Sequence, residues 1–278
     1  MTRLQLPDPP DACRPLNDVD FARLKKAKPG IWSDWHKRCI TCSKQGWFRT
    51  RDPRTGEIVE YECNCLNQWL MHIWLANAGI GLSFQRLGWG HAKSVPDEAR
   101  KTALSYCMKA EANLRVGRGM IFYSQDKGTG KTLLSSLLAK QMLADGHDVH
   151  FIQFNELLDS YQNSWRDRDL QVWFAQRIRN AKFLVIDDVG RENKGRIGVV
   201  ESMFDTVVRA RSAEALPTII TSNITPENMR VDYGDNIASL LTESYSLVKV
   251  DGPDYRPIVR ANHEADAEED LSYPVIVA

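Results

Sequence analysis

The hydrophobic pattern of the chain changes at about residue 119. From there on, short apolar runs alternate with stretches of helical periodicity, and the runs that resemble strands are residues 120–124, 149–154, 183–187, 218–221 and 246–250. Short apolar runs separated by helices indicate a parallel sheet with both faces covered by helices. This part of the chain is therefore predicted to have an α/β fold.

The part of the chain before residue 119 has a different pattern. Apolar side chains near helical spacing predict helices within residues 16–28, 66–78 and 96–114. Two short strands are expected at residues 47–51 and 58–62, because proline and glycine in the segment between them suit a turn. The sequence thus predicts a hairpin in the N-terminal part.

The same change of pattern gives the expected domain boundaries. Residues 1–78 would form an N-terminal domain and residues 96–260 the α/β domain, joined by an irregular, glycine-containing linker over residues 79–95. Residues 261–278 are rich in Asp and Glu, so a solvated, disordered tail is expected there.

Composition excludes several classes of protein. Of the 278 residues, 43% are hydrophobic and 26% are charged, which is ordinary for a globular protein. The 36 Lys and Arg balance the 36 Asp and Glu, so any contact with nucleic acid would come from a local patch and not from bulk attraction. No stretch approaches the roughly 18 apolar residues of a spanning helix, and no apolar leader is present, so we expect a cytoplasmic protein without a membrane partner.

A glycine-rich loop follows the first predicted strand of the α/β part and precedes a helix. The residues expected to bind a nucleotide here are Gln125, Lys127, Gly128, Thr129, Gly130, Lys131, Thr132 and Leu133. Backbone N–H groups made accessible by glycine can surround phosphate oxygens, Lys131 can reach the outer phosphates, and the Thr132 hydroxyl can bind Mg²⁺. A chance GKT in a glycine-rich turn is the alternative, but the strand–loop–helix context favours a nucleoside triphosphate site.

Polar side chains end two further predicted strands. Asp187 and Asp188 follow an apolar run, and we expect Asp187 to hold Mg²⁺ and Asp188 to orient or deprotonate a water molecule. Asn223 ends the next strand and could position this water or sense the terminal phosphate. Each segment alone could be an ordinary polar turn, but their combination with the glycine-rich loop favours one shared site.

Together these motifs resemble one family of proteins. GTGKT, LVIDD and IITSN occur in the order found in AAA+ ATPases of the DnaC, DnaI and IstB group, over roughly residues 80–260. The similarity continues in Tyr233-Gly234-Asp235, Ile237-Ala238-Ser239, Asp251-Gly252 and Tyr255-Arg256. Members of the group are replicative helicase loaders, their phage counterparts and helper ATPases of transposition. The resemblance implies an AAA+ P-loop core that binds ATP, single-stranded DNA and a partner, with a separate N-terminal domain that docks on the partner.

The chain departs from that family's pattern at three positions. Gln125 replaces the first glycine of the loop, Asp188 stands where a longer glutamate is usual, and Leu240 falls where an arginine finger is expected. Leucine cannot stabilise transition-state charge, so we expect ATP binding with weak ATP hydrolysis. Arg209 and Arg211 are candidates for a substitute trans-acting arginine, and an ordinary solvated role is the alternative.

Two close pairs of cysteines flank the predicted hairpin. The metal ligands that we expect are Cys39, Cys42, Cys63 and Cys65. Four thiolates around a turn can close a structural Zn²⁺ site with no open position. Reduced buried cysteines are the alternative, and His36 or His72 could replace one thiolate. Several loaders of the group carry a zinc-bearing N-terminal domain that docks on the helicase, so the resemblance implies the same role for residues 1–78.

Residues 165–179 interleave aromatic side chains with arginines, a composition suited to stacking bases and binding phosphates. The candidates for DNA contact are Arg166, Arg168 and Arg177, and a second candidate patch is Arg191, Lys194 and Arg196. Packing against the sheet is favoured for the apolar side chains that share one helical stripe, which are Leu170, Trp173, Phe174 and Ile178.

The sequence as a whole favours an ATP-dependent loader of a replicative DNA helicase. The N-terminal domain would bind the helicase, and the ATPase domain would bind single-stranded DNA and could self-associate. Two alternatives stay open. A transposition helper ATPase has the same motifs, although the zinc domain argues against it, and a nucleotide-binding adaptor without turnover would fit Asp188 and Leu240.

Overall fold

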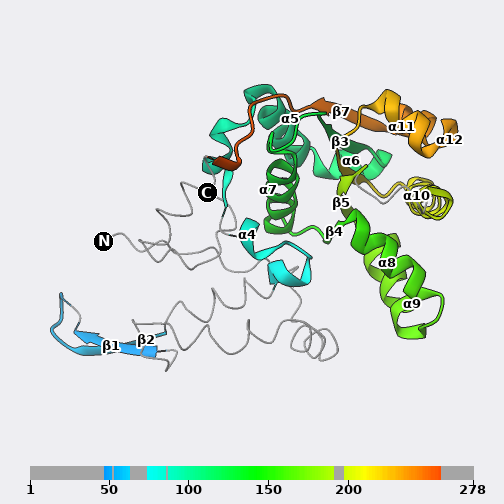
Figure 1. Ribbon diagram of the computed structural model, residues 1–278. Coiled ribbons are helices and arrows are strands. Elements are labelled where there is room, and N and C mark those ends of the chain that lie inside the picture. Colours follow the sequence, from blue (N-terminus) through cyan, green and yellow to red (C-terminus); the bar gives the residue numbers. More distant parts are fainter. Residues whose placement is uncertain (1–46, 52, 63–73, 86, 191–196, 258–278) are drawn as a thin grey trace. The chain divides into compact units, whose positions relative to one another are not determined.

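The structure is a computed structural model that describes residues 47–51, 53–62, 74–85, 87–190 and 197–257. The chain divides into two compact units, Met1–Asn77 and Ala78–Ala278. Figure 1 labels the helices and strands of both units.

In the first unit, the described residues include an antiparallel hairpin. β1 (Trp47–Arg51) pairs with β2 (Ile58–Glu62), with Trp47 opposite Glu62. The turn contains Gly56 at φ 72°, a left-handed conformation that glycine adopts without steric cost. The predicted hairpin is therefore confirmed. The four cysteines predicted to bind Zn²⁺ lie outside the described residues, and the residues that are described hold no group of three or more His, Cys, Asp or Glu side chains that could bind a metal ion.

The second unit is built on a five-stranded sheet in the order β4-β5-β6-β3-β7. Its strands, all parallel, are β3 (Gly119–Tyr123), β4 (Val149–Gln153), β5 (Phe183–Val189), β6 (Thr218–Ser222) and β7 (Tyr245–Lys249). Nearly every residue of β3, β5 and β6 is buried, because helices cover both faces, and this explains why these strands are continuous apolar runs in the sequence. The predicted parallel sheet is confirmed.

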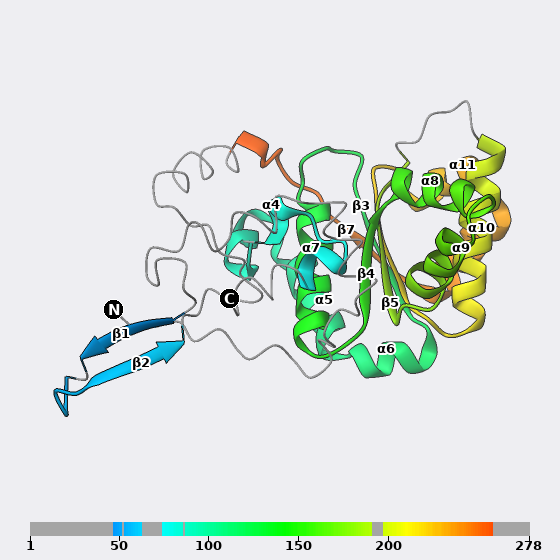
Figure 2. The same cartoon turned by 90° about the horizontal axis from the view of Figure 1, so that it is seen from below.

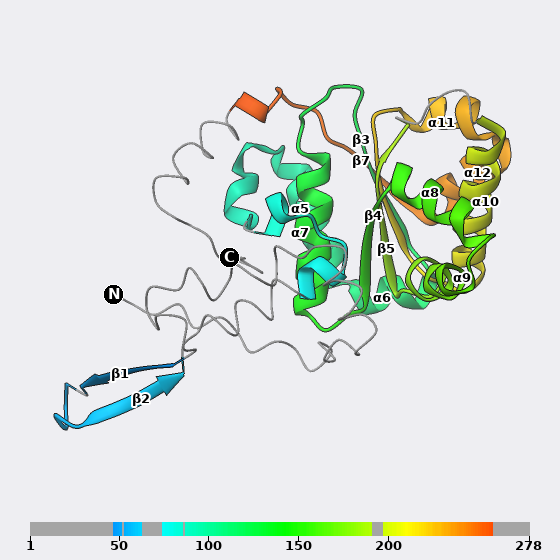
Figure 3. The ribbon, with the colours of Figure 1, turned by 60° about the horizontal axis from the view of Figure 1, so that its bottom comes forward.

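Helices cover both faces of this sheet. They are α4 (Leu82–Gln85), η2 (Trp89–Ser94), α5 (Asp97–Met108), α6 (Ala110–Val116), α7 (Lys131–Ala144), α8 (Phe154–Ser164), α9 (Arg168–Phe174), η3 (Ala175–Arg179), α10 (Ile197–Ala213), α11 (Pro226–Tyr233) and α12 (Asp235–Ser244). Figures 2 and 3 show α5 and α7 on one face and α8, α9 and α10 on the other. No helix in the described part of the chain is both long and apolar enough to cross a membrane.

A large apolar cluster lies between the sheet and the helices α8, α10, α11 and α12. Ile186 and Ile220 of the sheet are fully buried in it, and the rings of Phe154 and Phe204 meet edge to face with centroids 5.5 Å apart. The helical stripe predicted to pack against the sheet joins this cluster through Trp173, Phe174 and Ile178. Packing thus explains these apolar side chains.

Residues 79–95 differ from the expected irregular linker, since they contain α4 and η2. The Lys140 ammonium of α7 donates to the carbonyl oxygens of Gln85 (2.8 Å) and Leu87 (2.5 Å). At the edge of the sheet, the Phe151 N–H donates to the Ala78 carbonyl at 2.7 Å. The glycines of this segment predicted an irregular backbone, and the structure differs because residues distant in sequence bind its carbonyl groups.

The helix expected over residues 96–114 also differs from the prediction. It divides into α5 and α6 at Lys109, whose φ of −106° and ψ of 19° lie outside the helical region. The side-chain amide of Asn113 donates to the Tyr106 carbonyl at 3.0 Å across this break, so a side chain replaces one of the helical hydrogen-bond donors.

Candidate nucleotide-binding site

The glycine-rich loop joins the carboxyl end of β3 to α7. Gly128 and Gly130 have φ of 75° and 95°, conformations that other residues rarely adopt. Gly130 precedes the first turn of α7, whose N–H groups lack helical partners and carry partial positive charge. Gln125 is exposed and does not have a positive φ, so the loop accommodates a side chain at its first position.

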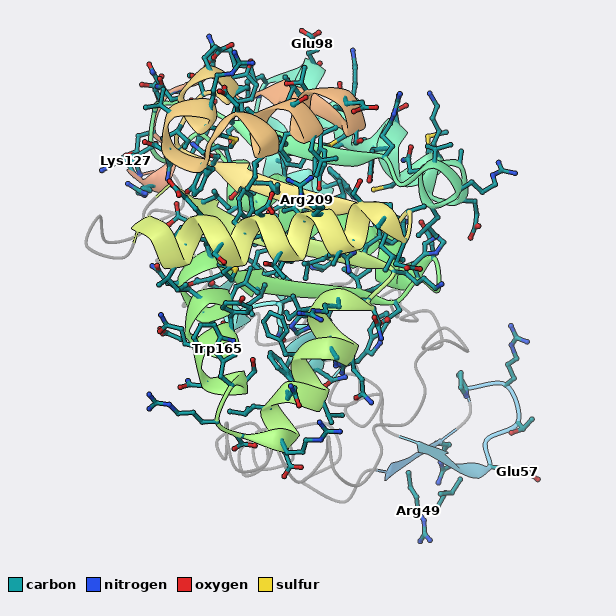
Figure 4. The ribbon with its side chains drawn as sticks, turned by 90° about the vertical axis from the view of Figure 1, so that its right-hand side faces the viewer. Arg49, Glu57, Glu98, Lys127, Trp165 and Arg209 are labelled. Atoms are coloured by element: carbon teal, nitrogen blue, oxygen red, sulfur yellow. The ribbon has the colours of Figure 1, made fainter. Side chains whose placement is uncertain are left out.

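Lys131 lies inside this loop. Its ammonium donates to the carbonyl oxygens of Asp126 (2.8 Å) and Ser124 (3.3 Å) and to Thr129 Oγ1 (3.4 Å). Burial lowers the pKa of Lys131, whereas nearby carboxylates oppose this shift. A lysine enclosed by a glycine-rich loop is the arrangement that binds the outer phosphates of a nucleotide. Among the other predicted loop residues, Thr129 is buried, Leu133 is half-buried and Lys127 lies at the surface (Figure 4).

Asp187 of β5 lies beside the start of α7. Its Oδ2 accepts from Thr132 Oγ1 at 3.2 Å, and its Oδ1 accepts from Thr221 Oγ1 at 2.7 Å. The residue is 4% exposed, and burial raises the pKa of its carboxyl to about 6. A threonine hydroxyl and a carboxylate beside a phosphate loop are the hard oxygen ligands that Mg²⁺ prefers, so the residues present fit this ion.

Asp188 lies where the pairing of β5 with β6 is irregular, between Ile186 and Val189. Its φ of 65° is uncommon for a residue with a side chain. Asn223 Nδ2 donates to Asp188 Oδ1 at 2.6 Å. The structure thus brings together Asp188 and Asn223, the two residues predicted to act on water, beside Asp187.

Two segments distant in sequence pack against the glycine-rich loop. The Tyr255 N–H donates to the Gly128 carbonyl at 3.0 Å, and a Cβ at Gly128 would lie 1.9 Å from Asp254 Oδ1. A Cβ at Gly130 would lie 2.6 Å from Val95 Cγ2. A side chain at either position would be strained at this positive φ, and the neighbouring Asp254 or Val95 side chain would have to move. Local sequence gave no signal for the role of Val95, because it arises from tertiary packing alone.

The two arginines of α10 that were candidates for a trans-acting role differ from each other. Arg211 is fully buried, and its guanidinium donates to the Pro217 carbonyl at 2.7 Å and to carbonyl groups at the end of η3. Burial thus contradicts both interpretations of Arg211 from the sequence, the candidate trans-acting role and the solvated alternative. Arg209 is exposed on α10 (Figure 4), and its Nε donates to Asp205 Oδ2 at 3.1 Å. Leu240 packs partly buried against the core.

The region of α8 and α9 carries the candidate DNA contacts. Trp165 is 67% exposed (Figure 4) and lines a pocket of about 210 Å³ with two other aromatic side chains. Arg166 and Arg168 are exposed, whereas Arg177 is half-buried, with Nη1 4.0 Å from Asp148 Oδ1. The second predicted patch, Arg191, Lys194 and Arg196, lies outside the described residues.

Comparison with protein families gives a match to the model described as IstB-like ATP binding protein over residues 99–257. Among curated proteins, the replicative helicase loader DnaI of Bacillus subtilis (strain 168) is 25% identical over 154 residues, which are 54% of this chain and 47% of that protein. The replicative helicase loader DnaC of Escherichia coli (strain K12) is 22% identical over 151 residues, which are 54% of this chain and 61% of that protein. The matches therefore span about half of DnaI and three-fifths of DnaC.

Solved structures with a similar fold include two of these loaders. The crystal structure of the DnaC helicase loader has a TM-score of 0.52 and 20% identity, covering 59% of this chain and 96% of that chain. The crystal structure of DnaI has a TM-score of 0.50 and 19% identity, covering 61% of this chain and 93% of that chain. The second unit therefore shares its α/β fold with these two loaders.

Proposed function

The chain belongs to the family of IstB-like ATP binding proteins, and we propose that it binds ATP with Mg²⁺ and loads a replicative DNA helicase. One observation supports nucleotide binding above all. The Lys131 ammonium lies within the glycine-rich loop, while Thr132 and Asp187 share a hydrogen bond of 3.2 Å beside it. The loader role is supported by similar proteins that are named replicative helicase loaders.

In the proposed complex, the glycine-rich loop binds the phosphates. Lys131 exchanges its carbonyl partners for phosphate oxygens, and Thr132 and Asp187 hold Mg²⁺. The backbone of the loop supplies the remaining contacts, through Gln125, Lys127, Gly128, Thr129, Gly130 and Leu133. Bound Mg²⁺ supplies positive charge that neutralises phosphate oxygens. The attraction of the cation also offsets the desolvation of the buried Asp187 carboxylate.

Hydrolysis of ATP is proposed to be slow. Asp188 is held by Asn223 at 2.6 Å, in a place suited to orienting water, but its side chain is one methylene shorter than glutamate. Leu240 packs against the core and carries no charge. These two observations also favour the second candidate function, a nucleotide-binding adaptor without turnover. ATP binding without phosphate release, with single-stranded DNA and the helicase both present, would support the adaptor and contradict the proposal that the protein hydrolyses ATP.

The first unit is proposed to dock on the helicase and to bind one Zn²⁺ through Cys39, Cys42, Cys63 and Cys65. The β1–β2 hairpin supports this proposal, because it lies in the sequence between the two cysteine pairs. Metal analysis of the purified protein tests it. About one zinc per chain is expected, and replacement of Cys39 and Cys42 by serine should remove it. A zinc-free, folded wild type would refute this part.

Single-stranded DNA is proposed to bind at α8 and α9, where Trp165, Arg166 and Arg168 are exposed. Aromatic faces stack on bases and arginines neutralise phosphates, so binding should weaken as salt concentration rises. Fluorescence anisotropy with a labelled oligonucleotide tests this assignment. Arg166→Glu and Arg168→Glu should each weaken binding, while Arg209→Glu on α10 is the matched single charge reversal and should not.

The loader function is tested by mixing the protein with the replicative helicase of its host in the presence of ATP. We expect the two proteins to co-elute in size-exclusion chromatography, and the helicase to reach single-stranded DNA that is covered by a binding protein. The same column run reports self-association of the protein alone. Absence of co-elution, together with normal ATP binding, would favour the transposition helper ATPase.

A further inference from the structure

A bulge in β5 places two consecutive carboxylates opposite one threonine. Along the β5–β6 ladder Ile186 pairs with Ile220 and Val189 pairs with Ser222, so Asp187 and Asp188 together oppose Thr221 alone. In a regular strand, consecutive side chains point to opposite faces of the sheet. An extra residue in one strand interrupts this alternation and re-aims a side chain. The bulge therefore allows both carboxylates to lie at the candidate nucleotide-binding site.

The Thr221 hydroxyl forms hydrogen bonds to both residues of this bulge. It donates to Asp187 Oδ1 at 2.7 Å and accepts from the Asp188 backbone N–H at 2.8 Å. A backbone N–H can only donate and an ionised carboxylate can only accept, so with Asp187 ionised the direction of both bonds is determined. Thr221 is 1% exposed, so water does not compete for its hydroxyl.

Each of these two hydrogen bonds stabilises a different part of the site. The bond to Asp187 helps to fix the carboxylate whose other oxygen accepts from Thr132. The bond from the Asp188 N–H holds a backbone whose φ is 65°, a conformation that residues with a side chain rarely adopt. Without the hydroxyl, the carboxylate would lose a donor and the backbone N–H would lose its acceptor.

We propose that Thr221 is a positioning residue that holds Asp187 in place as a Mg²⁺ ligand and keeps Asp188 in the bulge that directs it toward Asn223. This inference rests on the proposed function, because it concerns the Mg²⁺ that accompanies ATP. Thr218, at the opposite end of the same strand, is a natural comparison. Its hydroxyl is also buried, but it accepts a hydrogen bond from Arg211 Nε at 3.0 Å and lies away from the candidate site.

The experiment measures how much Mg²⁺ strengthens ATP binding, as the ratio of the ATP dissociation constants in EDTA and in Mg²⁺. Thr221→Val has nearly the shape of threonine without its hydroxyl, Thr221→Ser keeps the hydroxyl, and Thr218→Val is the control. Loss of a group that orients a metal ligand typically weakens metal affinity about 10- to 100-fold. We therefore expect the ratio to fall about tenfold or more in Thr221→Val, with ATP affinity in EDTA nearly unchanged.

Thr221→Ser and Thr218→Val should keep the wild-type ratio, even though Thr218→Val lowers stability. A second measurement needs neither nucleotide nor metal. Amide hydrogen exchange of the peptide that contains Asp188 should be faster in Thr221→Val than in Thr218→Val, compared at equal global stability. If Thr221→Val does not fold, Thr221→Ala and Thr221→Ser are compared by both measurements in its place.

The outcomes separate this inference from the proposed function. An unchanged ratio in a folded Thr221→Val, or a ratio lost equally in Thr221→Ser, overturns the role of the hydroxyl while ATP binding stands. Failure of the wild type to bind ATP in either buffer overturns the proposed function itself. The exchange measurement then still decides whether Thr221 holds the bulge.

Discussion

Among single residues, Asp187 is the one whose buried charge most clearly destabilises the folded protein. It is 4% exposed, and burial raises the pKa of its carboxyl from 3.8 to about 6, although hydrogen bonds from two threonines oppose this rise. At 1.36 kcal/mol per pKa unit, the ionised carboxylate destabilises the folded protein by up to about 3 kcal/mol in the absence of a cation. Residues kept for binding commonly lower stability in this way.

Asp187→Asn should therefore stabilise the nucleotide-free protein at neutral pH. Between pH 3.8 and about 6 the folded wild type binds more protons than the unfolded chain, so its stability relative to the variant falls as the pH rises through this window. We expect the variant to have a free energy of unfolding about 2 kcal/mol above wild type at pH 7.5, and nearly equal at pH 4, in urea titrations.

Asp232→Asn is the matched control, because Asp232 is exposed on α11 and should change stability little at either pH. A variant Asp187→Asn that is less stable than wild type at pH 7.5 would contradict the view that Asp187 is an ionised, desolvated ligand.

Arg211 and Arg209 provide a second contrast between buried and exposed residues of one helix. Arg211→Met removes a buried guanidinium that donates to four carbonyl groups, so we expect it to lower the free energy of unfolding by about 3 kcal/mol or more. Arg209→Met should change it little, because Arg209 is exposed. Urea unfolding measures both. Wild-type stability in Arg211→Met would show that its buried hydrogen bonds are dispensable.

Among the elements, the glycine-rich loop depends on a segment far away in the sequence. Gly128→Ala introduces both a strained φ and a clash with Asp254, whereas Gly234→Ala introduces strain alone, at φ 86° and ψ 159° in open space. Gly128→Ala should lose about 1 kcal/mol of stability from strain, and Gly234→Ala should lose more, because essentially only glycine adopts its φ and ψ. Only Gly128→Ala should also weaken ATP binding, by about tenfold or more, which is 1.4 kcal/mol. Calorimetric titration with ATP measures this difference.

A further substitution separates the clash from the strain. Adding Asp254→Gly to Gly128→Ala removes the clashing carboxylate and should recover part of the ATP affinity. Equal ATP affinity in Gly128→Ala and Gly234→Ala would mean that the approach of Asp254 to the loop has no bearing on the nucleotide site.

The strands were predictable from the sequence, because helices bury both faces of the sheet and leave continuous apolar runs such as that of β5. The segment that contains α4 and η2 was not. Its order depends on Lys140, which lies more than 50 residues away in sequence and binds its carbonyl groups. Glycine and short apolar spacings carry no information about such a partner.

The site was predictable to the same extent. The loop and the acidic end of β5 are local motifs, and parallel strands bring their carboxyl ends to one edge of a sheet. Thr221 was not identified, because threonine is an ordinary strand residue and the bulge arises only from the pairing of β5 with β6. Arg211 was assigned to the surface because a sequence does not show which face of α10 is buried.

For the whole molecule, the two units are assigned different tasks. The second unit shares its fold with solved helicase loaders and contains the nucleotide site, whereas docking on the helicase and Zn²⁺ binding are proposed for the first. The proposed loader function requires the second unit to bind nucleotide. A protein that binds ATP only in its folded state is stabilised by it, by about 2.7 kcal/mol at an ATP concentration 100 times the dissociation constant.

Isothermal titration calorimetry of the full chain with ATP and Mg²⁺ tests this account most directly. The wild type should bind ATP, and Lys131→Ala should lose that binding while keeping its fold, because the loop then has no ammonium to place against the phosphates. No heat of binding with folded wild-type protein, or equal affinity in Lys131→Ala, would contradict the account.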